Sequence, residues 1–196
     1  MKLGAAQHEL GANEAAVGPT REAVDVYRFL VTLRPNTYLA DLAAALDQLS
    51  SALGESGQHE AALINAMEAM DTYRRLVKER PETYLPRFAL MLTNLSTRLR
   101  NLGRHKEALP LAQNAVEWLW PHYERSPKLH EKTMGTMFSV LMALHEDLGT
   151  KINELWGQRF TRYATLAAGG PKEPAASNSP TKKSKSKAGK KAKSRG

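Results

Sequence analysis

Apolar residues recur along much of this chain at intervals of three and four, the spacing that buries one face of a helix. The two clearest stripes consist of large apolar side chains: Leu42, Leu46, Leu49 and Leu53, then Phe88, Leu92, Leu95 and Leu99. A glycine follows each stripe, where a helix can turn into the left-handed conformation and end. An alanine-rich stripe comes next and stops at an Arg-Pro or Ser-Pro pair. The chain is therefore predicted to form antiparallel helix pairs, since short side chains allow close approach.

Helices are expected at residues 39–54, 58–80, 85–102, 104–125, 129–148 and 151–166. Ser126, which precedes Pro127, is predicted to act as an N-cap, with proline at the first helical position. Pro86 would also fall in a first turn. Pro110, in contrast, lies inside a helix and should kink it, because proline lacks the N–H of the helical hydrogen bond.

The pattern repeats with a period of 46 residues. Four sets of identical residues follow this step: Gly11, Gly57, Gly103 and Gly149; Leu3, Leu49, Leu95 and Leu141; Pro35, Pro81 and Pro127; Ala23, Ala69 and Ala115. Residues 34–63 and 80–109 are identical at fourteen of thirty positions, where unrelated segments would share about two. A fixed period of this length indicates stacked helical units. We predict an all-α fold, a right-handed α-solenoid of antiparallel helix pairs.

The repeat also predicts the domain organisation. Residues 1–168 would form the repeat domain, with a partial unit at about 1–35, full units at 36–81 and 82–127, and a capping unit at 128–168. In the partial unit, residues 3–10 match only the second half of a first helix. Either the sequence is a fragment of a longer array, or this end self-associates, or a partner helix covers it, and the last two are favoured over fraying. In the capping unit, polar Glu154 and Thr161 replace the alanines, and an aromatic stripe of Trp156, Phe160 and Tyr163 appears.

Charge separates the C-terminal residues 169–196 from the rest. The formal charge of the 196 residues is +8, and residues 171–196 hold nine Lys or Arg and one Glu. This tail is predicted to be disordered, because it has no large apolar side chain to bury. Eight of its basic residues could neutralise phosphates of RNA, DNA or an anionic surface: Lys182, Lys183, Lys185, Lys187, Lys190, Lys191, Lys193 and Arg195. A merely solubilising tail is an equally good interpretation, and without aromatic residues the tail cannot stack on bases.

Catalytic and metal chemistry finds no support in the sequence. The chain has no cysteine, and its six histidines include no pair at i, i+4 with a nearby carboxylate, as a helical zinc site would need. No Gly-x-Ser-x-Gly or phosphate-binding glycine loop occurs. We therefore predict no enzymatic activity, no cofactor and no metal. No apolar run approaches the roughly 18 residues of a membrane span, so a cytoplasmic protein is expected, or a nuclear one if the basic run acts as an import signal in a eukaryotic cell.

The repeated residues resemble the tetratricopeptide repeat, whose unit has a Leu, a small residue, a Gly and two Ala at fixed offsets. Two units fit these offsets: Leu46, Leu49, Ser50, Leu53, Gly57, Ala62 and Ala69, then Leu92, Leu95, Ser96, Leu99, Gly103, Ala108 and Ala115. The family's usual unit has about 34 residues, whereas this one has 46. Such long units are similar to those of kinesin light chains and of repeat arrays attached to bacterial and fungal signalling NTPases or caspase-like proteases.

The resemblance implies that first helices line a concave groove for a partner peptide, and that an asparagine there bonds to the peptide backbone. Asn94 is the best candidate, in a Leu-Thr-Asn-Leu segment similar to the family's Leu-Asn-Asn-Leu. The expected groove residues are Asp47, Gln48, Ser51, Asn94, Thr97, Asn101 and Ser139. Asp47 stands where the family's chaperone-tail clamp has a lysine, so that specificity is not carried over.

Two functions follow as hypotheses. The preferred one is a non-enzymatic scaffold that binds a partner peptide or helix in the groove. The alternative is a nucleic-acid-associated protein that acts through its basic tail. Trp118 and Trp120 offer a further contact site, because they point about 200° apart on a helix and one of them should be poorly buried.

Overall fold

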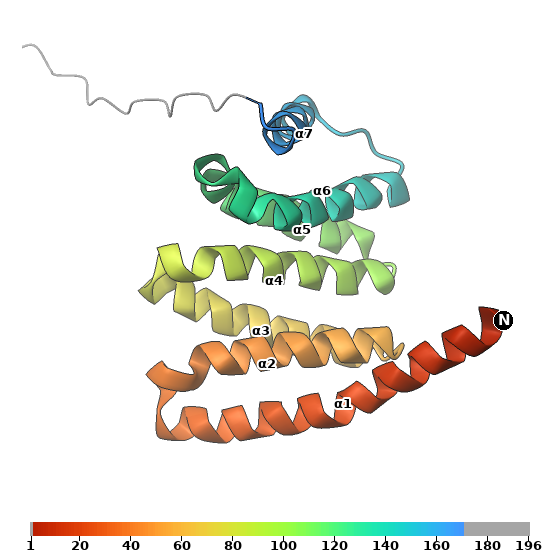
Figure 1. Cartoon of the computed structure of the whole chain (residues 1–196), viewed down its shortest axis with the longest axis vertical. Coiled ribbons are helices and arrows are strands. Elements are labelled where there is room, and N and C mark those ends of the chain that lie inside the picture. Colours follow the sequence, from red (N-terminus) through yellow and green to blue (C-terminus); the bar gives the residue numbers. More distant parts are fainter. Residues whose placement is uncertain (1, 171–196) are drawn as a thin grey trace, which may run out of the picture.

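The computed structural model describes residues 2–170, with side chains from residue 14 onward. This part of the chain forms seven helices and no strand (Figure 1). Their bounds are α1 (Lys2–Leu33), α2 (Pro35–Glu55), α3 (His59–Glu79), α4 (Pro81–Asn101), α5 (His105–Arg125), α6 (Pro127–Asp147) and α7 (Glu154–Ala167). Consecutive helices pack on one another in a single stack. The predicted all-α solenoid is therefore confirmed.

Glycine makes the turn between the two helices of each full unit. Gly57, Gly103 and Gly149 have φ angles of 80°, 71° and 62°, which is the left-handed conformation that glycine adopts without strain. After Gly57, the N–H of Gln58 donates to the carbonyl of Leu53 at 2.8 Å. The same bond follows the other two glycines, and this Schellman arrangement satisfies carbonyls at the helix end.

Proline makes the turn between units. Arg34, Arg80 and Ser126 each precede a helix that starts with proline, and their φ angles lie between −140° and −144°, because a following proline favours extended backbone. The predicted side-chain cap at Ser126 is wrong: its hydroxyl makes no capping bond. Its main-chain carbonyl instead accepts the N–H of Leu129 at 3.1 Å, so a side-chain acceptor for that donor is not needed.

α4 and α5 continue through internal prolines, as α1 does at Pro19. α4 begins at Pro81, earlier than expected, so Pro86 lies inside the helix rather than in its first turn. α5 likewise runs through Pro110 and Pro121. Each internal proline removes one backbone hydrogen bond, and both helices nevertheless keep a row of buried apolar side chains.

The N-terminal helix differs from expectation. A short helix over residues 3–10 ending at Gly11 was predicted, but α1 runs unbroken through Gly11, Gly18 and Pro19. A helical turn is stabilised when the two helices that it joins can pack together. Gly11 lies inside α1 instead of at the turn of a helix pair, and the residues after it continue the helix.

Small residues set the distance between the helices of each pair. The alanines at the predicted contact are fully buried: Ala62, Ala66, Ala69, Ala108 and Ala115. At the contact between α4 and α5, the hydroxyl of Ser96 donates to the carbonyl of Ala108 at 3.0 Å. The two backbones approach this closely because alanine has only a methyl group.

α7 closes the C-terminal end of the stack in a different way. In Figure 1 it is seen end-on, whereas the other helices lie across the view. The chain between Gly149 and α7 is longer than in the other units, and Asn153 caps the helix by accepting the N–H of Trp156 at 3.0 Å. Trp156 is buried, and the ring of Tyr163 lies tilted against that of Phe138 of α6, with the ring centroids 5.3 Å apart. The predicted aromatic stripe thus packs α7 against the array.

No helix in the described part is both long and apolar enough to cross a membrane. His59 and His105, which occupy equivalent positions in the repeat, are the first residues of α3 and α5.

Candidate functional site

The first helices of successive units, α2, α4 and α6, lie closer together than the second helices. Cα atoms of α2 and α4, and of α4 and α6, come within 8 Å of each other. No pair of second helices in the described chain does so. The stack therefore curves toward its first helices, which line the inner side. We call the exposed and half-buried surface of α2, α4 and α6 the inner face.

Asp47 and Asn94 join the first two of these helices. The side-chain amide of Asn94 donates to Oδ1 of Asp47 at 2.8 Å. Both side chains are half-buried. The bond fixes the orientation of the Asn94 amide, because its nitrogen must face the carboxylate. The amide oxygen and the second N–H of Asn94 make no other hydrogen bond within the described chain.

Arg98 makes a second link across the same helices. Its Nη2 donates to the hydroxyl of Ser51 at 3.3 Å. A Cβ built on Gly54 would lie 2.0 Å from Nη1 of Arg98, so the guanidinium occupies space that only glycine leaves open. Nε of Arg98 is buried and has no hydrogen-bond partner.

The charges of this cluster are perturbed by burial. Desolvation raises the pKa of the Asp47 carboxyl above its ordinary range, although Asn94, Arg98 and Arg87 oppose the shift. Desolvation also lowers the pKa of Arg98, against the attraction of Asp47 and Glu55. Each group is therefore short of solvation and would gain from further polar contacts.

Both links join residues that lie 47 positions apart, one more than the repeat period. A third link follows the same step between α4 and α6, where Nε of Arg100 donates to Asp147 at 2.5 Å. The ring of His105 lies 3.5 Å from the same carboxylate. Neighbouring first helices are thus joined by polar contacts at the inner face.

The remaining predicted groove residues do not join this network. Gln48 and Asn101 are exposed. The hydroxyls of Thr97 and Ser139 donate to carbonyls of their own helices, at 3.0 Å and 2.9 Å. The structure therefore brings together Asp47, Ser51 and Asn94 of the expected set.

Sequence reasoning missed Arg98. It stands where the other units have Ala52 and Leu144, both of which are buried, so the repeat pattern assigns it to the core. The sequence did carry one signal for Arg98, because a long side chain at a core position coincides with a glycine, Gly54. The next units have Arg100 and Glu146 at the position of Gly54.

One of the two tryptophans is poorly buried, as expected, while the contact site stays a prediction. Trp118 is 46% exposed, and its ring lies edge-on to Phe88 at 6.0 Å. It lines a shallow surface pocket with Leu85 and Pro121. Trp120 is half-buried and packs on Phe138 of α6.

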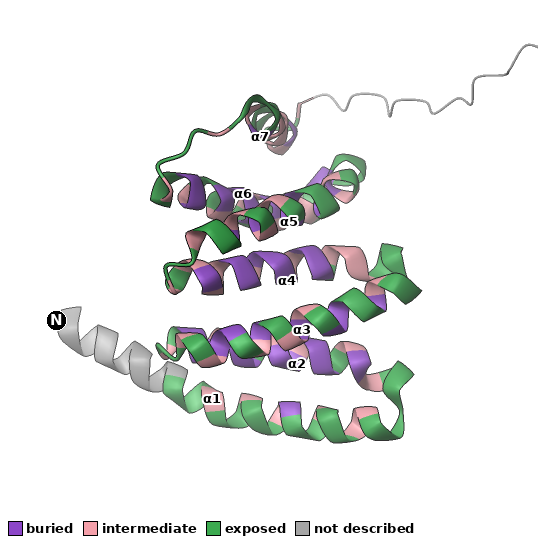
Figure 2. Ribbon diagram, turned by 180° about the vertical axis from the view of Figure 1, so that it is seen from behind, coloured by how far each residue is buried: buried purple, intermediate pink, exposed green. Residues whose placement is uncertain are grey.

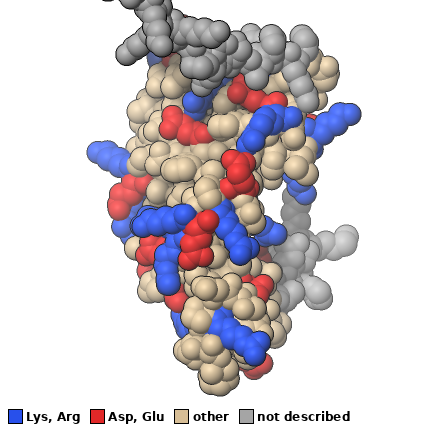
Figure 3. All heavy atoms as spheres, turned by 90° about the vertical axis from the view of Figure 1, so that its left-hand side faces the viewer, with Lys and Arg blue, Asp and Glu red and all other residues tan. Residues whose placement is uncertain are grey.

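The predicted polyanion-binding residues, 182–195, lie outside the described residues. On the folded part, Figure 3 shows Lys and Arg interleaved with Asp and Glu over the edge that carries the proline turns. This face offers no large surface of one sign. Positive and negative charges are thus balanced on this face, and the net positive charge of the sequence lies in residues 171–196.

Comparison with known proteins agrees with the repeat geometry. The tetratricopeptide repeat family model matches residues 42–82 and 88–117, which cover most of α2 to α5. No curated protein matches the chain. Repeats of this family are in general protein-interaction modules. Residues 42–117 of the chain therefore contain tetratricopeptide repeats, in units that extend from α2 into α5.

Proposed function

We propose that the protein is a scaffold whose inner face binds an extended or helical segment of a partner protein. The cluster of Asp47, Ser51, Asn94 and Arg98 would form the centre of this site. It lies on two neighbouring helices and therefore presents polar groups at fixed separations.

The observation that carries the proposal is the anchored amide of Asn94. An asparagine amide has two N–H donors and one acceptor oxygen, and Asp47 uses one donor. The remaining N–H and oxygen match the C=O and N–H of a peptide group. Because Asp47 already fixes the amide, less side-chain entropy is lost when a peptide binds.

A display library of random peptides, screened against the purified chain, tests this proposal. Peptides selected by the wild type should bind Asn94→Ala at least about tenfold more weakly, since a lost hydrogen bond near charged groups costs about 1.5 kcal/mol. The matched control is Asn114→Ala, which removes an exposed asparagine from α5, away from the inner face. Equal binding to wild type and Asn94→Ala would contradict the proposed site.

The Asp47→Asn variant separates anchoring from contact. It removes the carboxylate that orients Asn94 but leaves Asn94 in place. We expect peptide affinity to fall while the helical spectrum is unchanged. Affinity equal to that of the wild type would show that the Asp47 bond does not prepare the site.

A second role is proposed for the basic tail because of its charge, since residues 171–196 carry the whole net charge of +8. Removal of these residues should abolish retention on RNA or DNA and leave peptide binding intact. Binding by the full chain should weaken with salt, with a slope of about −0.7 for each phosphate contacted on a single strand. Retention that survives the deletion would assign nucleic-acid binding to the folded array.

A further inference from the structure

One side of α1 carries apolar residues that nothing in the described chain covers. Val26, Phe29 and Leu33 follow one another at helical spacing and are 56%, 63% and 62% exposed. Only Val24 is buried among the described side chains of α1, and Figure 2 shows most of that part of the helix exposed. The surface that we call the α1 face consists of Ala23, Val26, Phe29, Leu30 and Leu33.

Packing within the array does not require these apolar residues. The positions of Phe29 and Leu33 correspond in α3 to Arg75 and Glu79, which are charged and exposed. The helix pair of the next unit thus forms with polar residues at both positions. Two large apolar side chains that adjoin each other on one side of α1 therefore favour a contact outside the stack.

The adjoining part of α1 is also less covered than its counterpart in α3. Tyr27 and Leu30 are only half-buried, whereas the equivalent Tyr73 and Leu76 are buried. In α3 the preceding first helix, α2, covers this side. At α1 the preceding residues of the chain extend the helix instead of folding back over it.

Charges are arranged to leave the α1 face apolar. On the opposite side, Arg28 pairs with Glu68 at 2.6 Å and lies 3.7 Å from Asp25. Between residues 21 and 33, Glu22 is the one charged residue that helical spacing places on the apolar side. Arg34 borders the other end of this face, and within the described chain neither Glu22 nor Arg34 has an ion-pair partner.

We propose that the α1 face is a homodimer interface, in which the α1 helices of two copies pack antiparallel about a twofold axis near residue 28. Residues whose numbers add up to about 56 then face each other. Leu33 of one copy lies over the small Ala23 of the other. Glu22 of each copy meets Arg34 of the other, so both exposed charges are paired.

A second copy of the chain fits this surface because the complementary acid and base both lie at the same face of α1. A twofold interface uses the same surface twice, and therefore needs an acid and a base at equal distances from its centre. Glu22 and Arg34 meet this condition, with the apolar residues between them. The inference does not depend on peptide binding at the inner face, which lies on other helices.

Light scattering and sedimentation of the full chain over a dilution series test the proposal. The wild type should dimerise, and the double variant Phe29→Arg, Leu33→Glu should raise the dissociation constant at least about a hundredfold. These substitutions introduce the residues that α3 carries at the same positions, so the monomer should keep its helical spectrum. Leu129→Glu is the control, because Leu129 is 76% exposed on α6 and should not affect dimerisation.

A charge exchange tests the register. Glu22→Arg and Arg34→Glu should each weaken the dimer about tenfold, and the double variant should recover most of the loss. The proposal is overturned if the wild type stays monomeric at the highest concentration. It is also overturned if the α1 face of the wild type binds a different protein instead of a second copy. The antiparallel register is wrong if the double variant is no stronger a dimer than the single ones.

Discussion

Each end of the array has a terminal helix with one side uncovered, and the two helices, α1 and α7, carry different residues on that side. Positions that correspond in the repeat show this residue by residue. Ala16, Ala23 and Tyr27 of α1 become Glu154, Thr161 and Thr165 in α7.

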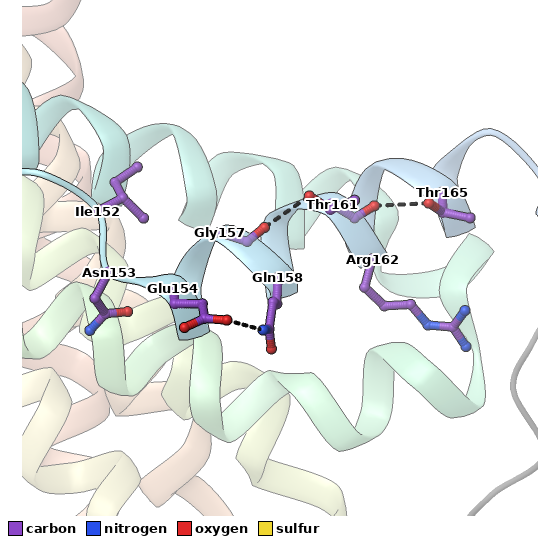
Figure 4. Close-up of a pocket in the computed structure, with 8 residues that line it drawn as sticks. All are labelled: Ile152, Asn153, Glu154, Gly157, Gln158, Thr161, Arg162 and Thr165. Carbon is purple, nitrogen blue, oxygen red and sulfur yellow. Dashed lines mark hydrogen bonds between the residues drawn. The ribbon is translucent and has the colours of Figure 1, made fainter.

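At the C-terminal end these polar residues line an open pocket (Figure 4). Within it Gln158 donates to Glu154 at 3.1 Å, and the hydroxyl of Thr165 donates to the carbonyl of Thr161 at 2.9 Å. α7 packs through its other side, where Trp156 is buried although the equivalent Ile64 of α3 is exposed. The helix has thus exchanged its polar and apolar sides.

The difference shows that a solenoid end can be closed by changing residues at fixed repeat positions. α7 is polar where a further helix would dock and therefore ends the described array. α1 keeps the residues of an internal helix and adds Phe29 and Leu33. α7 thus presents polar residues on its uncovered side, whereas α1 presents apolar residues that the proposed second copy would cover.

The largest expected contrast is between two phenylalanines. Phe138 is 2% exposed and lies among aromatic rings of α5 and α7. Phe138→Ala should reduce the free energy of unfolding by about 3 to 5 kcal/mol through the cavity that it leaves. Phe29→Ala, measured at a concentration too low for dimers, should change it by less than about 0.5 kcal/mol. Equal losses would show that α1 is covered within the monomer.

A second contrast uses equivalent alanines. Ala108 is fully buried between α4 and α5, so Ala108→Phe should destabilise by about 1 to 3 kcal/mol through overpacking. Ala62→Phe should behave in the same way. Ala16 occupies the same repeat position on α1 but is exposed, so Ala16→Phe should leave the thermal midpoint nearly unchanged. A similar drop in all three variants would contradict the difference in coverage.

A smaller effect concerns the cap of α7. Asn153→Ala removes the acceptor for the N–H of Trp156 and should cost about 1 kcal/mol. Ser126→Ala is the matched control, because Ser126 holds the N-cap position of α6 without a side-chain cap. Denaturant unfolding of both variants measures the difference, and equal midpoints would mean that the Asn153 cap does not hold α7.

The smallest expected effect is a pH dependence near α5 and α6. Burial lowers the pKa of His130 below its ordinary value, and His122 and Arg125 add to the shift. A lowered pKa in the folded state means that stability is present above about pH 6.5 and is lost as the pH falls through the folded value. Between pH 7 and pH 5 the thermal midpoint should therefore fall less in His130→Gln than in the wild type. Parallel curves would exclude this histidine as the cause.

Much of the fold could be predicted because each structural signal occurs in more than one repeat unit. The glycine and proline turns recur at one period, and the buried alanines mark the helix contacts. The N-terminal helix could not be predicted in this way, because Gly11 stands at the repeat position of Gly57 but lies within α1 and makes no turn.

The inner face was predictable only in part. Asn94 was identified through the family resemblance, and its position beside Asp47 agrees with stacked first helices. The hydrogen bond between Asn94 and Asp47 joins residues 47 positions apart, one more than the repeat period. The sequence alone does not give this offset. Arg98 was missed because it leaves a core position through the gap at Gly54.

The most direct test of the contrast between the two ends is amide hydrogen exchange of the full chain at low and high protein concentration. Protection of residues 22–33 in α1 should rise with concentration, while protection of α7 stays the same, because only α1 is completed by a second copy. Protection in α1 that does not depend on concentration, or an equal rise in α7, would contradict this expectation.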